Sequence, residues 1–377
     1  MAAKRVLHVA GSAEWAGGEV YLLQLAERLD RARFRLSVVC PAEGPLVHRL
    51  ERLGVPATVI PLEEQLVDPR ALRALTRHFT REQPHLVQSH GARANFYSRL
   101  AARLARVPRH VSTVHNSLYD YPVSPLRRAV YLAFDRLTVP WTETILCVAE
   151  SLARDLIERS RVPARKVQVI PNGVDLARFD PARADGERVR RAVGLGEGPV
   201  LGIVGRMTPQ KDHATFLAAL AGVKATVPDV RALIVGDGPL RREIEAEAAR
   251  LGVREACHFT GVREDIPDCL AAMSVVLLSS VSEGFPFTVL EALAMARPLV
   301  ATTVNGVTEI VEPGVTGILV APRRPDLLAH ATLTLLRDPE RARALGQAGR
   351  KAVEARFPIE RMVERMERLY TGDGRDA

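Results

Sequence analysis

Residues 279–303 constrain the fold of this chain more than any other stretch of its sequence. They follow the apolar run at residues 275–278, which lacks polar alternation and is therefore typical of a buried strand in a parallel sheet. A loop containing glycine and proline comes next, then a helix expected over residues 287–296, which Pro298 ends, and then a second apolar strand. Strand, helix and strand in this order predict a parallel sheet with crossover helices, in which ligands bind at the loops after the strands.

Two glutamates flank the loop of this stretch. Glu283 lies in the loop after the first strand, and Glu291 lies eight residues further on, about one turn inside the expected helix. Because helical Cβ atoms tilt toward the helix N-terminus, Glu291 can reach back to a ligand held at the loop. The backbone N–H groups of residues 285–288 can meet an anionic part of the same ligand. Two glutamates alone are better explained as surface residues, but this pair at the end of a parallel strand favours a binding site.

Apolar strands alternate with helices along the rest of the chain, and two halves begin in the same way. Residues 199–204 open the second half as residues 4–10 open the first, each strand being followed by a polar or glycine-bearing loop and a helix. We therefore predict an α/β protein with two Rossmann-like domains, residues 1–172 and 173–357. The strands expected in the first domain lie at residues 4–10, 35–40, 57–60, 86–88, 110–113, 144–147 and 167–170.

Loops after several of these strands carry residues suited to a phosphorylated ligand. Gly17 and Gly18 remove side chains where a helix begins, so a phosphate can approach the backbone amides. Arg206 and Lys211 share the loop after the strand at residues 199–204, and a guanidinium with an ammonium can clamp two phosphates. A glycine pair by itself is weak support for a site. The lysine is notable because lysine is scarce in this chain.

Two histidines fall at the carboxyl ends of expected strands, His90 and His115. A lone histidine is more often packed in a core than functional, but a position at the end of a parallel strand favours contact with a ligand. No cysteine has a metal-ligand spacing, and Cys40, Cys147, Cys257 and Cys269 are expected to be buried, reduced thiols of a cytosolic protein. No apolar run approaches the length of a membrane span. Aromatic residues make up only 5% of the chain, which disfavours nucleic-acid binding.

The net charge of +8 is concentrated in the first half, since residues 1–172 carry +9 and the remainder −1. A basic half can contact an anionic membrane or a phosphorylated acceptor, or can reflect an arginine-rich composition without function. The helix expected at residues 126–137 is apolar over more than one narrow stripe, and the preceding helix carries Arg93, Arg99, Arg103 and Arg106. These helices either form a surface that touches anionic lipid or pack on the sheet with a solvated arginine face.

Three segments resemble signatures of the retaining GT-B glycosyltransferases of family 4. They are Glu283-x7-Glu291 with Gly-Phe-Pro in between, Gly205-Arg206-x4-Lys211, and the turn at residues 172–175. The resemblance covers nearly the whole chain. It implies the GT-B fold, with two Rossmann-like domains facing across a cleft and a C-terminal helix, about residues 358–377, packed back on the first domain. Asn305 departs from the family pattern, which usually has two glycines at this segment.

The resemblance also implies roles for residues at matching positions. Glu291 would bind ribose hydroxyls, Glu283 the sugar hydroxyls, and His115 the transferred sugar from the opposite domain. Catalytic residues would be His115, Arg206, Lys211 and Glu283. Donor-binding residues would be Gly17, Gly18, Arg206, Lys211, Val262, Glu283, Gly284, Phe285, Pro286, Phe287, Thr288 and Glu291, and acceptor-side residues His90, Asn116 and Tyr119.

The expected activity is transfer of a sugar from a nucleotide-diphosphate sugar, UDP favoured over GDP, to an acceptor hydroxyl. The acceptor would be a carbohydrate, a lipid-linked molecule or a small molecule, in the synthesis of lipopolysaccharide, capsule, exopolysaccharide or glycolipid. No Asp-x-Asp motif occurs, so no metal or other cofactor is expected. The enzyme would be cytoplasmic, with a peripheral contact to the plasma membrane as a further hypothesis. The alternatives are a GT-B nucleotide-sugar epimerase or hydrolase and a non-catalytic nucleotide-sugar-binding subunit.

Overall fold

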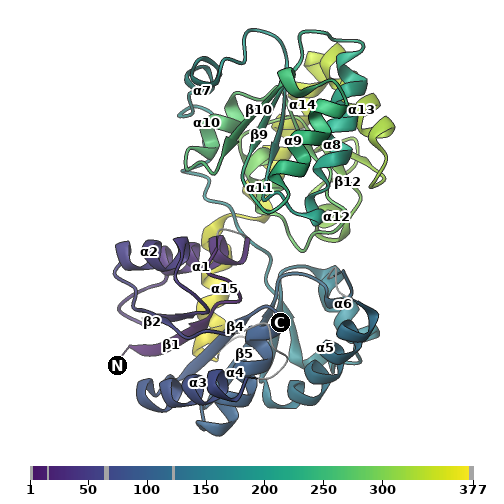
Figure 1. Cartoon of the computed structure of the whole chain (residues 1–377). Coiled ribbons are helices and arrows are strands. Elements are labelled where there is room, and N and C mark those ends of the chain that lie inside the picture. The colour runs from purple at the N-terminus through teal and green to yellow at the C-terminus, as the bar shows by residue number, and fades with distance from the viewer. Residues whose placement is uncertain (1–2, 15–16, 63–67, 121–123, 373–377) are drawn as a thin grey trace. The chain divides into compact units, whose positions relative to one another are not determined.

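The computed structural model describes residues 3–14, 17–62, 68–120 and 124–372. Residues 15 and 16 of the glycine loop and residues 373–377 of the expected C-terminal segment lie outside this part of the chain. The chain divides into two compact units (Figure 1). Unit 1 comprises Met1–Asn172 with Glu360–Ala377, and unit 2 comprises Gly173–Ile359.

Unit 1 is built on a seven-stranded sheet in which every neighbouring pair is parallel. The order is β3-β2-β1-β4-β5-β6-β7. The strands are β1 (Lys4–Val9), β2 (Phe34–Cys40), β3 (Ala57–Val59), β4 (Leu86–His90), β5 (Arg109–Val114), β6 (Thr144–Cys147) and β7 (Val167–Val169). The helices are α1 (Gly17–Arg28), α2 (Pro45–Arg52), α3 (Pro69–Glu82), α4 (Ala92–Leu104), α5 (Pro125–Thr138), α6 (Glu150–Glu158) and α15 (Ile359–Thr371), with short 3-10 turns η1 (Leu118–Asp120), η2 (Val139–Trp141) and η3 (Ala164–Lys166).

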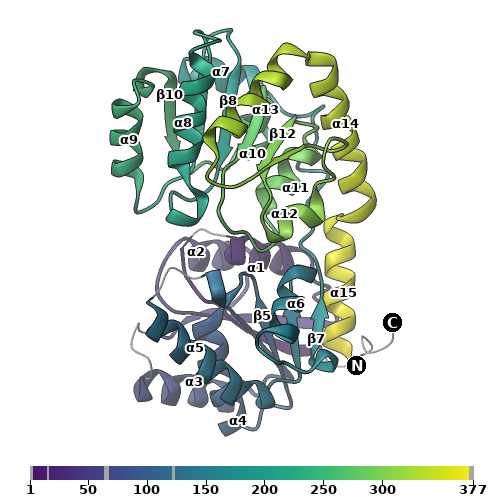
Figure 2. The same cartoon turned by 90° about the vertical axis from the view of Figure 1, so that its right-hand side faces the viewer.

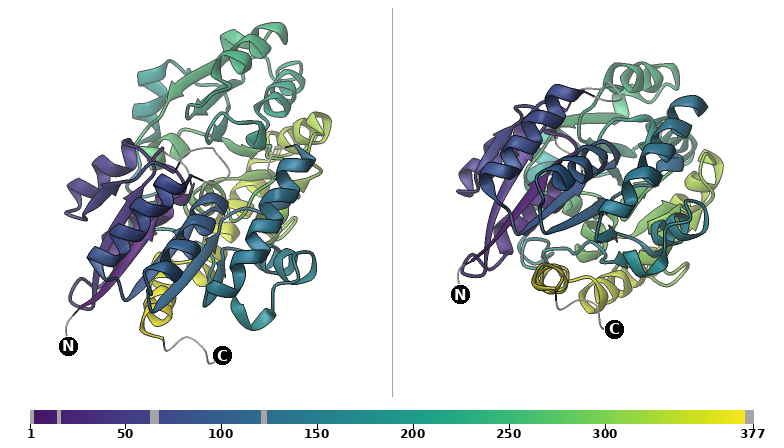
Figure 3. Two further views of the ribbon diagram at one scale, coloured as in Figure 1. Left: turned by 60° about the horizontal axis from the view of Figure 1, so that its bottom comes forward. Right: turned by 90° about the horizontal axis from the view of Figure 1, so that it is seen from below.

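The two faces of this sheet differ in chemistry. Leu7, Val9 and Val87 pack with Leu75 and Tyr97 in an apolar core under α3 and α4, which lie along one face of the sheet (Figure 3). Successive side chains of a strand point to opposite faces. The residues between these apolar ones, including His8 and Gln88, therefore point to the other face, and both are fully buried there.

Helix α15 packs on that second face, although unit 2 separates it in sequence from the rest of unit 1 (Figure 2). The hydroxyl of Tyr370, which is 1% exposed, lies 3.0 Å from Nε2 of His8. Arg109 donates to the carbonyl oxygens of Leu369 and Tyr370 at 2.9 Å each, and the hydroxyl of Tyr21 donates to the sulfur of Met366. These contacts make α15 an integral part of unit 1.

Unit 2 repeats the plan with a six-stranded parallel sheet in the order β10-β9-β8-β11-β12-β13. The strands are β8 (Val200–Val204), β9 (Arg231–Val235), β10 (Cys257–Gly261), β11 (Val275–Leu278), β12 (Leu299–Thr302) and β13 (Ile318–Val320). The helices are α7 (Gly186–Val193), α8 (His213–Lys224), α9 (Arg241–Arg250), α10 (Ile266–Ala271), α11 (Phe287–Ala294), α12 (Asn305–Ile310), α13 (Pro325–Arg337) and α14 (Pro339–Arg356), with 3-10 turns η4 (Pro209–Lys211) and η5 (Arg254–Ala256). An α/β protein with two parallel sheets, as predicted, is confirmed.

One arginine expected on the basic surface of α4 is instead buried. Arg99 is 1% exposed, and its guanidinium contacts the carboxylate of Asp135 on α5 at 2.6 Å and the hydroxyl of Ser112 at 2.8 Å. Neither alternative, a lipid-facing or a solvated arginine, holds for Arg99, because this side chain joins α4, α5 and β5. Its neighbours Arg103 and Arg106 line a cavity described below.

Two other expectations concern burial and membrane spans. The four cysteines are free and buried, as predicted. Among the described residues, no helix is both long enough and apolar enough to cross a membrane.

Candidate active site

The topology of unit 2 brings two loops together at the carboxyl edge of its sheet. Strands β8 and β11 are neighbours, and the chain continues from β8 to one side of the sheet and from β11 to the other. Loops that leave a parallel sheet in opposite directions open a crevice where ligands bind. The loop after β8 contains Arg206 and Lys211, and the loop after β11 contains Glu283.

The structure joins two of the predicted residues in a buried ion pair. The ammonium of Lys211 lies 2.6 Å from Oε1 of Glu283, and the hydroxyl of Ser280 donates to the same oxygen at 2.6 Å. The side chains of Lys211 and Glu283 are 19% and 6% exposed. An ammonium has three donors and a carboxylate has two oxygens, so the pair retains hydrogen-bonding capacity for a ligand.

Hydrogen bonds between the two loops hold this pair in place. The hydroxyl of Ser279 donates to the carbonyl of Lys211 at 2.9 Å, and Nε2 of Gln210 donates to the carbonyl of Ser282 at 2.7 Å. The amide of Val281 donates to the carbonyl of Gln210 at 2.9 Å. Asp212 follows in the left-handed region, with φ of 47°, and its carboxylate caps α8. The loops are therefore fixed before any ligand binds, as a site that stabilises charge requires.

Glycines allow the backbone of the Arg206 loop to approach its neighbour. A Cβ on Gly236 would lie 2.1 Å from the carbonyl oxygen of Gly205, and Gly236 has a φ of 130°. A Cβ on Gly238 would lie 2.6 Å from the carbonyl oxygen of Met207. The Gly-x-Gly sequence after β9 thus serves close contact between two loops.

Helix α11 carries the second glutamate of the predicted site. Glu291 is half-buried in α11, and Pro286 directly precedes the helix. Burial raises the pKa of Glu291 from its usual value to about 7, against the opposing effects of Arg178 and Lys211. The carboxyl group therefore exists in both protonation states near neutral pH.

The raised pKa of Glu291 predicts a pH-dependent stability. Between pH 4.5 and 7 the folded chain keeps a proton that the unfolded chain releases, so the stability falls as the pH rises through about 7. Replacing Glu291 with glutamine removes this loss. We compare the free energy of unfolding of E291Q with that of the wild type at each pH. This difference should be more favourable to E291Q at pH 8 than at pH 5, by up to about 3 kcal/mol. Chemical denaturation at the two pH values measures it.

The control for this prediction is Glu247→Gln. Glu247 is a half-buried helical glutamate whose pKa is lowered by its bond to Arg250, so its replacement should not reproduce the difference. Equal pH dependence of E291Q and the wild type would contradict the assignment.

The remaining predicted donor-binding residues of unit 2 occupy several environments. Phe285 and Phe287 are buried, and the hydroxyl of Thr288 contacts the carbonyl of Val204 at 3.4 Å. Gly284 packs against Gly306, where an added Cβ would lie 1.7 Å from the carbonyl oxygen of Gly284. Val262, by contrast, is 56% exposed and follows β10, two strands away from β8. The structure therefore places Val262 apart from the ion pair.

Unit 1 has a corresponding edge where β1 and β4 are neighbours and their chains leave in opposite directions. Gly17 begins α1, and a Cβ on Gly18 would lie 3.7 Å from Cδ2 of His115. His115 follows β5, and its Nε2 lies 3.1 Å from Nδ1 of His90. The glycine loop and both predicted histidines therefore meet at this edge.

A small cavity of about 40 Å³ adjoins His115 and is also lined by Asn116 and Tyr119. The hydroxyl of Tyr119 lies 3.1 Å from that of Ser160, and the guanidinium of Arg159 stacks over its ring at 3.7 Å. The cavity has room for a water molecule but not for a sugar. Tyr119 thus has a structural role in unit 1 in addition to its predicted position on the acceptor side.

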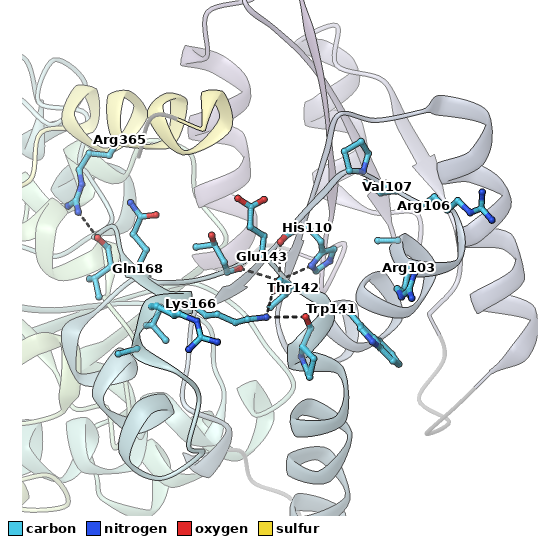
Figure 4. Close-up of a pocket in the computed structure, with 18 of the residues that line it drawn as sticks. Arg103, Arg106, Val107, His110, Trp141, Thr142, Glu143, Lys166, Gln168 and Arg365 are labelled. Carbon is cyan, nitrogen blue, oxygen red and sulfur yellow. Dashed lines mark hydrogen bonds between the residues drawn. The ribbon is translucent and has the colours of Figure 1, made fainter. Parts of the chain in front are cut away.

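A larger cavity, of about 1130 Å³, opens at the opposite edge of the same sheet (Figure 4). His110 of β5, Thr144 of β6 and Val167 of β7 line it, together with Arg103, Arg106, Arg165 and Trp141. Lys166 lies in its wall, where the ammonium donates to the carbonyls of Val139, Pro140 and Thr142. This cavity is basic, but it does not contain the predicted acceptor-side residues.

The residues that position the predicted ones carry no recognisable sequence signal. Ser280 and Gln210 fix the ion pair, yet serine and glutamine in a loop give no specific signal. His213 is 2% exposed, and neither ring nitrogen has a hydrogen-bond partner among the described residues. Burial, and then the charge of Lys211, lower the pKa of His213 to about 4. His213 lies two residues after Lys211, and this closeness to a predicted site residue is the sequence signal that marks it as a candidate.

Comparison with known proteins agrees with this architecture. Residues 15–178 match the family model described as Glycosyltransferase Family 4, and residues 198–338 match that described as Glycosyl transferases group 1. The UDP-Gal:alpha-D-GlcNAc-diphosphoundecaprenol alpha-1,3-galactosyltransferase of Escherichia coli is 28% identical, over 97% of this chain and 96% of that protein. The 2-deoxystreptamine glucosyltransferase of Streptomyces kanamyceticus is 32% identical over 69% of each chain.

Solved structures show the same fold. The crystal structure of Anabaena HepE in complex with UDP and glucose has a TM-score of 0.86 and 23% identity, covering 97% of this chain and 99% of that one. WaaG, a glycosyltransferase involved in lipopolysaccharide biosynthesis, has a TM-score of 0.79 and 17% identity, covering 97% and 100%.

Two parallel-sheet domains with these relatives define a GT-B glycosyltransferase that acts on nucleotide sugars. The chain belongs to glycosyltransferase family 4.

Proposed function

We propose that this protein is a retaining glycosyltransferase that uses a UDP-sugar and needs no metal ion. The observation that carries the proposal is the Lys211–Glu283 pair at the carboxyl edge of β8 and β11. Lys211 and Arg206 bind the donor diphosphate and stabilise the charge that develops on it as it leaves. Glu283 accepts hydrogen bonds from sugar hydroxyls, Glu291 binds the ribose, and His115 contacts the transferred sugar.

The reaction proceeds without a protein nucleophile. The bond from the anomeric carbon to the diphosphate breaks, and the acceptor hydroxyl forms a new bond on the same face of the sugar. The departing phosphate takes the proton of that hydroxyl. The anomeric configuration is therefore retained.

Two relatives support different donors. The E. coli relative is named for UDP-Gal, whereas a 29% identical mannosyltransferase of Mycobacterium tuberculosis is named GDP-mannose-dependent. The E. coli relative covers far more of the chain, 97% against 72%, which favours UDP. Its name also supports a lipid-linked acceptor, in the synthesis of a surface polysaccharide or glycolipid.

Donor screening followed by product analysis tests this function. A UDP-sugar should raise the melting temperature more than GDP- or ADP-sugars, and NMR of the product should show the anomeric configuration of the donor. Inversion, or a preference for another nucleotide, contradicts the proposal. Donor turnover without any acceptor would identify an epimerase or hydrolase, and binding without turnover a non-catalytic subunit.

Metal independence is a separate prediction. Among the described residues, no three His, Cys, Asp or Glu side chains gather in a way that could hold a metal ion. We expect transfer rates to stay within about twofold after treatment with EDTA, because cationic side chains stabilise the leaving group. Loss of activity in EDTA that Mg²⁺ or Mn²⁺ restores would contradict it.

The proposal includes a peripheral contact between unit 1 and an anionic membrane. The large apolar side chains that unit 1 exposes in its described part all come from one segment, α4 to η2: Leu104, Leu126, Leu137 and Trp141. Arg103 and Arg106 flank Leu104 in the sequence and line the same cavity as Trp141. Apolar side chains beside cationic ones suit the surface of an anionic bilayer.

We predict that the protein sediments with vesicles that contain phosphatidylglycerol but not with pure phosphatidylcholine vesicles. Binding should weaken as salt rises, since exposed charges are screened within about 8 Å at physiological ionic strength. Leu137→Ser with Trp141→Ser should reduce binding, whereas Val262→Ser with Val315→Ser, the matched exposed pair of unit 2, should not. A wild-type protein that ignores anionic vesicles at low salt would instead indicate a small, water-soluble acceptor.

A further inference from the structure

Three histidines of unit 1 form a continuous hydrogen-bonded row. Nδ1 of His8, on β1, lies 2.9 Å from Nε2 of His90, at the end of β4. Nδ1 of His90 in turn lies 3.1 Å from Nε2 of His115. Neighbouring rings are nearly parallel, with interplanar angles of 17° and 21°. Each contact uses opposite nitrogens of successive rings, so the protonation of one ring determines that of the next.

The inner end of the row is closed by a tyrosine and a glutamine. The hydroxyl of Tyr370 lies 3.0 Å from Nε2 of His8 and donates to Oε1 of Gln88 at 2.6 Å. A hydroxyl that gives its proton to Gln88 can only accept from His8. The orientation of the Gln88 amide therefore decides which way the row is polarised.

The hydrogen bonds of Gln88 agree with that orientation. Its Nε2 donates to the hydroxyl oxygen of Thr113 at 2.7 Å, and its Oε1 accepts from the hydroxyl of Tyr370 at 2.6 Å. The hydroxyl of Tyr21 donates to the sulfur of Met366 at 3.1 Å and takes no part in the row.

The three imidazoles are neutral at physiological pH. Burial lowers the pKa of His8 to about 3 and that of His115 to about 4, and burial together with its two neighbours lowers the pKa of His90 well below its usual range. A neutral imidazole has one N–H and one bare nitrogen. The row consequently has two possible states, in which every ring is protonated at Nε2 or every ring at Nδ1.

The direction follows from the inner end. His8 donates through Nε2 to Tyr370, so its Nδ1 is bare and accepts from Nε2 of His90. Nδ1 of His90 is then bare and accepts from Nε2 of His115. The last ring is left with a bare Nδ1, and no hydrogen bond from the described residues reaches this atom.

We propose that Gln88 and Tyr370 hold His115 in its Nε2–H tautomer through this row of histidines. The bare Nδ1 of His115 then accepts a hydrogen bond from a hydroxyl of the transferred sugar, a step that rests on the function proposed above. Gln88, Tyr370, His8 and His90 are positioning residues, and only His115 contacts the substrate. The hydrogen bond made by one ring nitrogen of a functional histidine commonly selects the tautomer in this way.

The tautomers can be observed directly. In the wild-type protein labelled with ¹⁵N-histidine, long-range ¹H–¹⁵N spectra at pH 7 should show His115 with a pyrrole-like Nε2 and a pyridine-like Nδ1. His8 and His90 should show the same pattern. Protonation of His115 at Nδ1 would overturn the proposal, and this measurement needs no variant to fold.

Two tyrosine variants separate positioning from a general structural role. Tyr97 is also fully buried in unit 1, and its hydroxyl accepts a hydrogen bond from the amide of Asp68, outside the row. Tyr370→Phe and Tyr97→Phe each remove one buried hydroxyl. Both should lower the melting temperature, but only Y370F should mix the two tautomers of His115 and lower kcat several-fold. A single, unchanged tautomer of His115 in Y370F would overturn the proposal that Tyr370 sets this tautomer through the row of histidines.

The same experiment separates two claims: that the row of histidines sets the tautomer of His115, and that His115 contacts the sugar. If Y370F mixes the tautomers but keeps the wild-type kcat and KM, the first claim stands and the second is overturned. If the tautomers are unchanged while kcat falls in both variants, control of the tautomer by the row of histidines is overturned, and the fall in kcat has a structural cause.

Discussion

Replacing Lys211 with methionine is expected to lower kcat by about 100- to 1000-fold, which corresponds to roughly 3–4 kcal/mol of transition-state stabilisation. The ammonium lies 2.6 Å from the carboxylate of Glu283 at the edge of β8 and β11, and the leaving diphosphate gains charge as its bond to the sugar breaks. Arg206→Ala should act in the same direction, because both cations share one loop. Steady-state kinetics with a UDP-sugar measures both effects.

The buried pair adds an effect that the sequence did not suggest. In K211M the carboxylate of Glu283 keeps only the hydrogen bond from Ser280 among the described residues, and a buried charge that loses its partner costs roughly 3 kcal/mol. The melting temperature should therefore fall. Adding Glu283→Gln removes the unpaired charge, so the double variant should regain most of the melting temperature without regaining turnover.

Lys224→Met is the matched control. Lys224 is a half-buried lysine of the same unit, outside the proposed site, whose ammonium contacts the carbonyl of Gly252 at 3.4 Å. This variant should keep the wild-type rate and stability. Near-normal kcat in both K211M and Arg206→Ala would refute the assignment of these cations to the diphosphate.

Gly306→Ala is expected to destabilise unit 2 and to reduce activity together. A Cβ at this position would lie 1.7 Å from the carbonyl oxygen of Gly284 and 3.0 Å from Cα of Phe285, far inside van der Waals contact. Backbone must move to admit it, at a cost of about 3 kcal/mol, which is typical of severe overpacking. The melting temperature should fall by roughly 5–10 °C. Because Gly284 follows Glu283, the same movement displaces the ion pair.

Asn305→Ala provides the control one residue away. The Asn305 side chain lies in the first turn of α12 and is half-buried, and its replacement introduces no atom at the Gly284 backbone. We expect a change below about 1 kcal/mol and near-normal turnover. Equal effects of N305A and G306A would show that the close approach at Gly306 is unimportant.

Asn305 and Gly306 also show which of the two family glycines the structure requires. The family pattern has two glycines here, and this chain has Asn305 in place of one of them. The structure assigns the steric requirement to Gly306, which the chain retains. Asn305 departs from the pattern at the position where a side chain fits.

The strands were predictable because parallel strands buried on both faces are continuous apolar runs. The bounds of β6 and β11 agree with the prediction to the residue, and β4 and β5 differ by two residues at most at either end. The ends of strands then locate the loops, which is why Lys211 and Glu283 could be placed near each other without coordinates. Their roles toward the donor remain predictions.

The row of histidines in unit 1, with Tyr370 and Gln88 at its inner end, was not predictable in the same way. Tyr370 and Gln88 are separated by 282 residues, and no sequence pattern reports so distant a hydrogen bond. A partial signal did exist, since His8 and Gln88 are polar residues within otherwise apolar strands. Buried polar groups need partners, so each implied an unidentified contact on the second face of the sheet. The sequence did not show that α15 supplies it.

Helix α15 has a consequence for biosynthesis. The sheet of unit 1 is complete by β7, but the helix that covers its polar second face is translated only after all of unit 2. Until then His8 and Gln88 have no partner from α15, whereas unit 2 already has its whole core. During synthesis unit 1 therefore begins first but is completed last. Its second face stays uncovered by α15, and accessible to chaperones, until the last helix has been made.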